Sequence, residues 1–154
     1  MVGPALTRLS SHRAIHEAAW AEAEQIVAWA RRAYGEQAND LFARTVEAFL
    51  VHVETRIFSH AEEEERGLYP TWLTDHPEKT STVEELRHEH DTLRRMAQDI
   101  DELMRLGDRA RALEALQTLL EHSARHSRHE ERWLFGGEGA DELQLSVPDG
   151  RVVP

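Results

Sequence analysis

The stretch His60–Pro70 reads HAEEEERGLYP, and the stretch His126–Gly136 near the far end of the chain reads HSRHEERWLFG. Each begins with a histidine and carries a glutamate four residues later, at Glu64 and Glu130. Residues four apart share one face of an α-helix, so each stretch presents an imidazole and a carboxylate in the same direction. Two such helices facing each other would bring two histidines and two carboxylates to one point. The pattern therefore indicates a metal site.

The composition is typical of a soluble helical protein of one domain, with 154 residues, 40% of them hydrophobic and 31% charged. A net charge of -11 argues against nucleic acid and anionic membranes as partners. The chain has no cysteine, which excludes disulfides and iron–sulfur clusters. No apolar run approaches the ~20 residues of a membrane span, and no signal-peptide core is present at the N-terminus. We therefore expect a cytoplasmic protein.

Hydrophobic periodicity predicts an all-α fold with four long helices. Apolar residues recur every three or four positions over residues 10–34, 39–66, 82–106 and 109–135. Two short connections and one of about fifteen residues favour an up-down-up-down four-helix bundle. We expect this bundle to occupy residues 1–136. Glycine, proline and charged residues dominate residues 137–154, which should form a short irregular C-terminal tail.

Capping residues set the predicted ends of these helices. The expected N-terminal caps are Ser10 or Ser11, Asn39 or Asp40, Thr82 with Glu85, and Asp108. Gly35 and Gly107 should end the first and third helices. In the second helix, Gly67 and Pro70 predict a stop, which leaves Gly67–Ser81 as a loop.

Polar residues that can bind metal stand on the inner faces of all four predicted helices. In the second helix they continue an apolar series, so they should point into the core. The set comprises His16, His60, Glu64, His90, His126 and Glu130. A buried ionised carboxylate costs several kcal/mol unless it is paired, and no lysine or arginine stands on the nearby inner faces. A pair of metal ions would supply the missing charge. Imidazole with carboxylate suits iron, whereas zinc more often takes fewer ligands.

These motifs are similar to those of the hemerythrin-like, HHE cation-binding family. The first helix has a histidine, the second His-x-x-x-Glu followed by an aromatic residue and proline, the third Glu-His, and the fourth His-x-x-x-Glu-Glu. The similarity covers about residues 9–136. It implies a four-helix bundle around a non-heme centre of two iron ions, oxo- or carboxylate-bridged. The implied ligands are His16, His60, Glu64, His90, His126 and Glu130. Family members carry or sense oxygen, handle nitric oxide or peroxide, or sense iron.

One position departs from the pattern of the oxygen-carrying members. They have His-x-x-x-His in the third helix, where this chain has Leu86 one turn before His90. One iron would then lack a protein ligand, unless His12 or His122, each one turn before a predicted ligand, takes that place. An under-ligated iron can bind small anions and peroxide directly. The departure therefore favours redox chemistry over simple reversible oxygen carriage.

Other polar residues near these motifs have less specific patterns. Glu131 stands five residues after His126, where oxygen carriers have an aspartate, and is either solvated or bonded to a ligand histidine. Tyr69 should plug the end of the bundle, with a role as ligand or radical donor as the alternative. His12 is expected to be exposed near the helix start unless it is the extra ligand. Surface positions are expected for His52, Glu62, Glu63, Glu65, His76, His88 and His129.

Several functions remain open for a di-iron bundle of this kind. The first is an enzyme that reacts with hydrogen peroxide, O2 or NO, with peroxide decomposition favoured. The second is a protein without turnover that binds, senses or stores oxygen or iron, and a zinc-binding bundle is a third. In each redox case the partner is a small molecule. The chain is expected to be a monomer or a small homo-oligomer.

Overall fold

The computed structural model describes residues 9–136, and the predicted tail lies outside this range. Within the described residues the chain is helical and contains no strand, which confirms the all-α prediction. The α-helices are α1 (Leu9–Gly35), α2 (Asn39–His52), α3 (Ser59–Glu63), α4 (Tyr69–Asp75), α5 (Thr80–Arg105) and α6 (Arg109–Phe135). Two π-helical segments, η1 (Val53–Phe58) and η2 (Glu64–Leu68), and one 3-10 turn, η3 (Pro77–Lys79), complete the fold.

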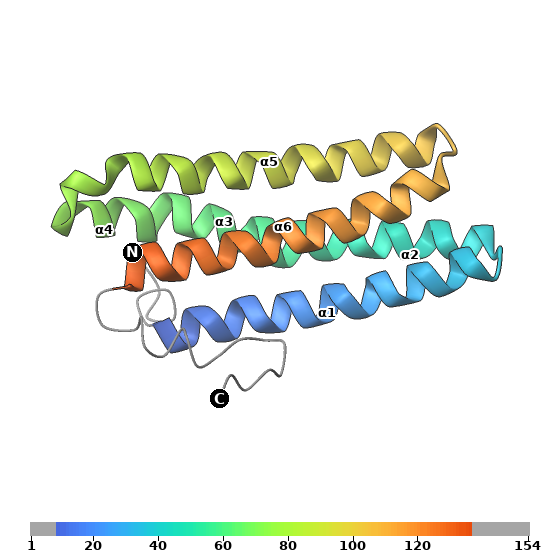
Figure 1. Ribbon diagram of the computed structural model, residues 1–154, viewed down its shortest axis with the longest axis horizontal. Coiled ribbons are helices and arrows are strands. Elements are labelled where there is room, and N and C mark those ends of the chain that lie inside the picture. The colour runs from blue at the N-terminus through green and yellow to red at the C-terminus, as the bar shows by residue number, and fades with distance from the viewer. Residues whose placement is uncertain (1–8, 137–154) are drawn as a thin grey trace, which may run out of the picture.

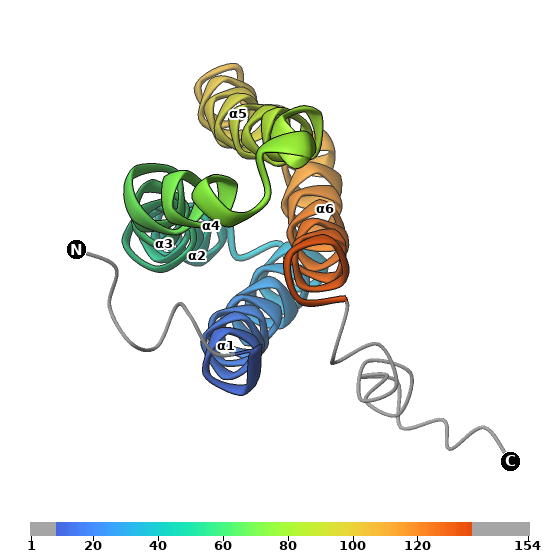
Figure 2. The same cartoon turned by 90° about the vertical axis from the view of Figure 1, so that its left-hand side faces the viewer.

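These elements form a bundle of four long rods (Figure 1). The helices α1, α5 and α6 are each one rod, and α2, η1, α3, η2 and α4 run on into one another as the fourth. Viewed along the bundle, the rods surround a common centre (Figure 2). None of the described helices combines the length and the apolarity that crossing a membrane requires.

The prediction that Gly67 and Pro70 end the second helix is wrong, since the rod continues to Asp75. The π turn before the proline explains this. In η2 the backbone N–H of Tyr69 bonds to the carbonyl of Glu64, five residues back. With the same five-residue spacing, the backbone N–H at position 70 would donate to the carbonyl of Glu65, but Pro70 has no N–H. That carbonyl accepts instead from Arg87 Nη2 at 3.2 Å, so it is not left unsatisfied.

The capping predictions are only partly confirmed. Asp108 caps α6, with its carboxylate accepting from the backbone N–H of Arg111 at 3.2 Å. Gly107 ends the third long helix at φ 76°, a conformation that costs glycine little. The caps predicted at Asn39 or Asp40 and at Thr82 with Glu85 are wrong, because Ala38 and Lys79 hold those positions without a side-chain bond. Ser10 and Ser11 lie within α1.

Two apolar clusters leave a polar layer between them. The larger one fills the bundle toward the α1–α2 turn and contains Phe42, Phe49, Ile100, Leu116 and Leu119. The smaller one consists of Leu68, Tyr69, Val83, Leu86 and Leu134. Along α5, Leu86 belongs to the smaller cluster and Leu93 to the larger, and His90 lies between them. The inward-facing polar residues therefore occupy one level of the bundle, with apolar packing on both sides.

Candidate metal centre

The structure brings the six predicted inward-facing residues together at this level. His16 comes from α1, His60 from α3, Glu64 from the start of η2 and His90 from α5, while α6 supplies the other two, His126 and Glu130. The carboxylates of Glu64 and Glu130 are 1% and 0% exposed. Their ligand atoms form two sets that share both glutamates, which we call the first group and the second group.

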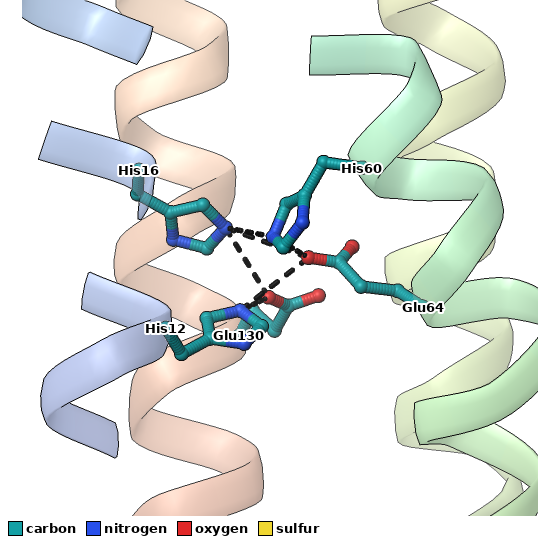
Figure 3. A group of neighbouring side chains, drawn as sticks. All are labelled: His12, His16, His60, Glu64 and Glu130. Carbon is teal, nitrogen blue, oxygen red and sulfur yellow. Dashed lines mark hydrogen bonds and ion pairs between the residues drawn. The ribbon is translucent and has the colours of Figure 1, made fainter. Parts of the chain in front are cut away.

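The first group is His12, His16, His60, Glu64 and Glu130 (Figure 3). One nitrogen or oxygen of each residue lies within 4.8 Å of all the others. Glu64 Oε1 lies 2.6 Å from His60 Nε2, 3.4 Å from His12 Nε2 and 3.5 Å from His16 Nε2. Glu130 Oε1 contacts His12 Nε2 and lies 3.6 Å from His16 Nε2. Three imidazoles thus surround one oxygen from each carboxylate.

The second group is Glu64, His90, His126 and Glu130. His90 Nε2 lies 3.1 Å from Glu64 Oε2 and 2.8 Å from His126 Nε2. His126 Nε2 in turn lies 3.7 Å from Glu130 Oε2. Each glutamate therefore turns Oε1 to the first group and Oε2 to the second. Carboxylates placed in this way could bridge two ions.

The expectation that His12 is exposed is wrong, because its side chain is 0% exposed. His12 lies one turn before His16 on the same face of α1, and its ring centroid is 5.5 Å from that of Phe135 at the end of α6. The spacing of four residues before a predicted ligand was the available signal. His122, the other candidate for an extra ligand, joins neither group, and its Nδ1 accepts from Arg125 Nη2 at 3.2 Å.

Carboxylates on the outer side of the histidines fix the orientation of the rings. His90 Nδ1 donates to Glu65 Oε1 and His126 Nδ1 donates to Glu89 Oε2, both at 2.7 Å. When Nδ1 carries the proton, the lone pair of Nε2 faces inward, as a metal ligand requires. Sequence analysis missed this role of Glu89 and wrongly placed Glu65 among the solvated residues, because both bonds link different rods.

Two of the less specific candidates also have defined partners. Glu131 is buried and not solvated, and its Oε1 forms an ion-pair contact of 3.5 Å with His16 Nδ1. Tyr69 is fully buried, and its hydroxyl donates to Glu130 Oε2 and lies 3.4 Å from Glu64 Oε2. Residues five apart diverge by about 140° in an α-helix. The π turn that closes on Glu64 lets Tyr69 face the same way.

Among the histidines expected at the surface, His76 and His88 are exposed. His52 is buried instead, with Nε2 donating to the carbonyl of Ala19 at 2.8 Å. His129 is half-buried, and its Nδ1 donates to Glu89 Oε1 at 2.7 Å. The position of these last two rings depends on neighbouring rods, which helix periodicity alone does not describe.

The proton positions follow from burial and from the facing charges. Burial would raise the pKa of Glu64, but the close imidazoles of His16, His60 and His90 outweigh burial and hold this pKa well below 4.5. Burial would lower the pKa of His16, but Glu131, Glu64 and Glu130 raise it from 6.5 to about 10. The pKa of His90 is raised for similar reasons. Without a cation, protonated histidines therefore neutralise the buried carboxylates.

The unpaired atoms test whether these residues fit a metal. Among the described residues, Glu64 Oε1 and the Nδ1 atoms of His12 and His16 are buried without a hydrogen-bond partner. Glu64 Oε1 lies close to three imidazole nitrogens, yet none of them makes a hydrogen bond to it. Nitrogens and oxygens that converge without hydrogen-bond geometry fit a shared cation better than a network of protons.

The model of one protein family matches most of the chain. Its description is Hemerythrin HHE cation binding domain, and it matches residues 13–136. The chain belongs to this hemerythrin family. Comparison with curated proteins and with solved structures gave no match. Membership confirms the family resemblance found in the sequence, and together with the His and Glu groups it indicates that this hemerythrin-like protein binds metal.

Proposed function

We propose that this hemerythrin-like chain holds two non-heme iron ions and reacts with a small oxidant, with hydrogen peroxide favoured over O2 and NO. The observation that carries the proposal is the division of each buried carboxylate between the two groups, Oε1 toward the first and Oε2 toward the second. Histidine nitrogens with carboxylate oxygens suit iron. The five residues of the first group exceed the four ligands of a closed zinc site.

In this proposal the histidines of the first group and the two glutamates hold one ion, and the second group holds the other. When bound, the irons would supply Lewis acidity and store electrons. Glu64 and Glu130 would contribute an oxygen to each position, while Glu65 and Glu89 accept hydrogen bonds from Nδ1 of His90 and His126, so that Nε2 of each ring is the nitrogen that would face the ion. The second group offers only four protein residues, which leaves room there for a small molecule.

Tyr69 would hold a proton beside the second group. Burial, with the charges of Glu130 and Glu64, raises the pKa of Tyr69 far above 10. The residue therefore remains a phenol whose hydroxyl donates to Glu130 Oε2. A fixed donor at this point holds the carboxylate of Glu130 in place and limits proton loss from the site.

Peroxide decomposition needs no external reductant. One peroxide is oxidised to O2, losing two electrons and two protons, and a second accepts them and yields two waters. A cavity of about 30 Å³ adjoins both groups, against the ~10–15 Å³ that one water needs. This volume suits a molecule of two or three heavy atoms.

Metal analysis and peroxide assays test the proposal. Protein purified without chelator should contain about two irons per chain and absorb in the near ultraviolet. It should release O2 from hydrogen peroxide faster than free iron at equal concentration. One zinc per chain with a featureless spectrum would contradict the proposal. A reversible, oxygen-dependent band without turnover would favour the second candidate function, the binding or sensing of a diatomic by the same cavity.

The arrangement of the whole chain is part of the proposal. We assign the rods an up-down-up-down order, because consecutive rods are joined by short turns and pack side by side (Figure 1). We propose that residues 1–136 form one metal-binding domain and that residues 137–154 are its C-terminal tail. We expect a monomer or a small homo-oligomer.

A further inference from the structure

The cavity beside the two groups has a polar floor and apolar walls. His16, His60, Glu64, His90 and His126 line it on the side of the metal centre. Ile57, Phe58 and Leu93 also line it, and their side chains carry no hydrogen-bonding groups. Inside such a cavity a polar molecule exchanges its water hydrogen bonds for whatever the protein offers, and apolar walls offer none. A donor in the wall would therefore decide which molecules are retained.

Trp20 supplies a donor of this kind. It lies one turn after His16 on α1 and lines the same cavity. Its indole Nε1 is buried and has no hydrogen-bond partner in the described part of the chain. Leaving a buried N–H without an acceptor costs free energy, so such groups are rare unless a water or ligand accepts the hydrogen bond.

Two other donors in the wall are engaged elsewhere. Arg56 Nη2 lies 3.5 Å from Glu22 Oε1, and Ser127 Oγ donates to the carbonyl of Ser123 at 3.1 Å. Tyr69 Oη donates to Glu130 and is not among the residues that line the cavity. The hydroxyl of Ser123 also lines the cavity and is the competing donor. The indole of Trp20 is the donor that is buried without a partner in the described part of the chain.

We propose that the indole N–H of Trp20 donates a hydrogen bond to the small molecule that occupies this cavity. The inference rests on the proposed function, because the cavity adjoins the proposed iron positions. Trp20 then determines specificity. Molecules or anions with an acceptor atom, such as peroxide or azide, gain a hydrogen bond that a carbon monoxide molecule of similar size gains only weakly. The ring also closes one wall and helps to keep larger molecules out.

Azide binding to iron-loaded protein tests this role. Trp20→Phe keeps an aromatic wall and removes the donor, and Trp29→Phe, at a residue of the same helix that is 57% exposed, is the matched control. Titration followed by absorption should give azide affinity about tenfold weaker for Trp20→Phe and unchanged for Trp29→Phe. Iron content should be equal in both variants and the parent. Equal azide affinity in Trp20→Phe and the parent would overturn the inference.

Further measurements separate this role from a purely structural one. Metal-free Trp20→Phe should melt within a few degrees of the metal-free parent, because the N–H that it removes has no partner. In the iron-loaded parent, azide should slow hydrogen exchange at the Trp20 indole and leave the Trp29 indole unchanged. Unchanged exchange at Trp20, or a loss of azide affinity only in Ser123→Ala, would contradict the inference. A parent without iron would overturn the proposed function, and this inference with it.

Discussion

The first and second groups differ although they arise from two similar halves of the chain. Aligning His16 with His90 pairs His12 with Leu86, and aligning the two His-x-x-x-Glu stretches pairs Phe135 with Tyr69. In the structure, His12 joins the first group and Phe135 packs against its ring. The second group has the apolar Leu86 in place of a third histidine, and Tyr69 lies beside it.

Because of this difference, we expect the two metal positions to differ in their capacity for a further ligand. The first group has three imidazoles, and its neighbour Phe135 has an apolar side chain. We therefore expect this group to have little capacity for another ligand. The second has two imidazoles and a hydroxyl within 3.5 Å of His90 Nε2. In the proposed function, the two halves have diverged at two positions each, so that one metal position is structural and the other is reactive. We expect small molecules to react at the second group.

The largest effect is expected where the two groups are joined. Glu64→Ala removes one oxygen from each group, so it should reduce bound iron from about two per chain to less than about half of one. Iron content by elemental analysis after desalting measures this loss. Glu63→Ala, next to it but exposed, is the control and should retain iron like the parent. Equal losses in the two variants would contradict the inward orientation of Glu64.

Exchanging the residues that distinguish the groups should affect one position at a time. His12→Leu makes the first group resemble the second, and we expect about one iron per chain to be held less tightly. Leu86→His should supply the second group with a third imidazole. Azide binding and peroxide consumption should both decrease in that variant by about tenfold or more. If Leu86→His binds azide like the parent, the open position does not lie on the side of Leu86.

The affinity for metal should rise with pH because of His16. Its pKa is raised from 6.5 to about 10 in the metal-free protein. The resulting stabilisation of the metal-free fold is fully present below pH 6.5 and is lost as the pH rises through about 10. Iron must displace this proton, so anaerobic iron(II) titrations should show about tenfold tighter binding per pH unit per proton released. Glu131→Gln, which removes a partner that raises this pKa, should flatten the dependence.

The smallest effect should come from Tyr69→Phe. This substitution places a phenylalanine beside the second group, as Phe135 lies beside the first. The variant loses the donor to Glu130, so the free energy of unfolding of the metal-free protein should fall by about 1–2 kcal/mol. Iron content should be retained, and peroxide consumption should fall a few-fold. Denaturant unfolding and O2 release measure the two effects. Loss of half the iron would instead identify Tyr69 as a ligand.

The sequence by itself determined that the chain forms long amphipathic helices and that six of their polar residues face inward. Apolar residues every three or four positions specify an amphipathic helix without reference to the rest of the chain. His60 and Glu64 continue such a series, which is why their meeting with His16, His90, His126 and Glu130 could be predicted. The family followed from the same local motifs.

Only the tertiary structure decided which atoms meet. His12 bonds to Glu130 across 118 residues, and Glu65 and Glu89 bond to histidines of other rods. The rod continues past Pro70 because Arg87, from the next rod, satisfies the carbonyl of Glu65. Periodicity assigns a side chain to a face of its own helix, but the rotation and the level at which rods pack determine its partner. The asymmetry between the two groups therefore became visible only in the assembled bundle.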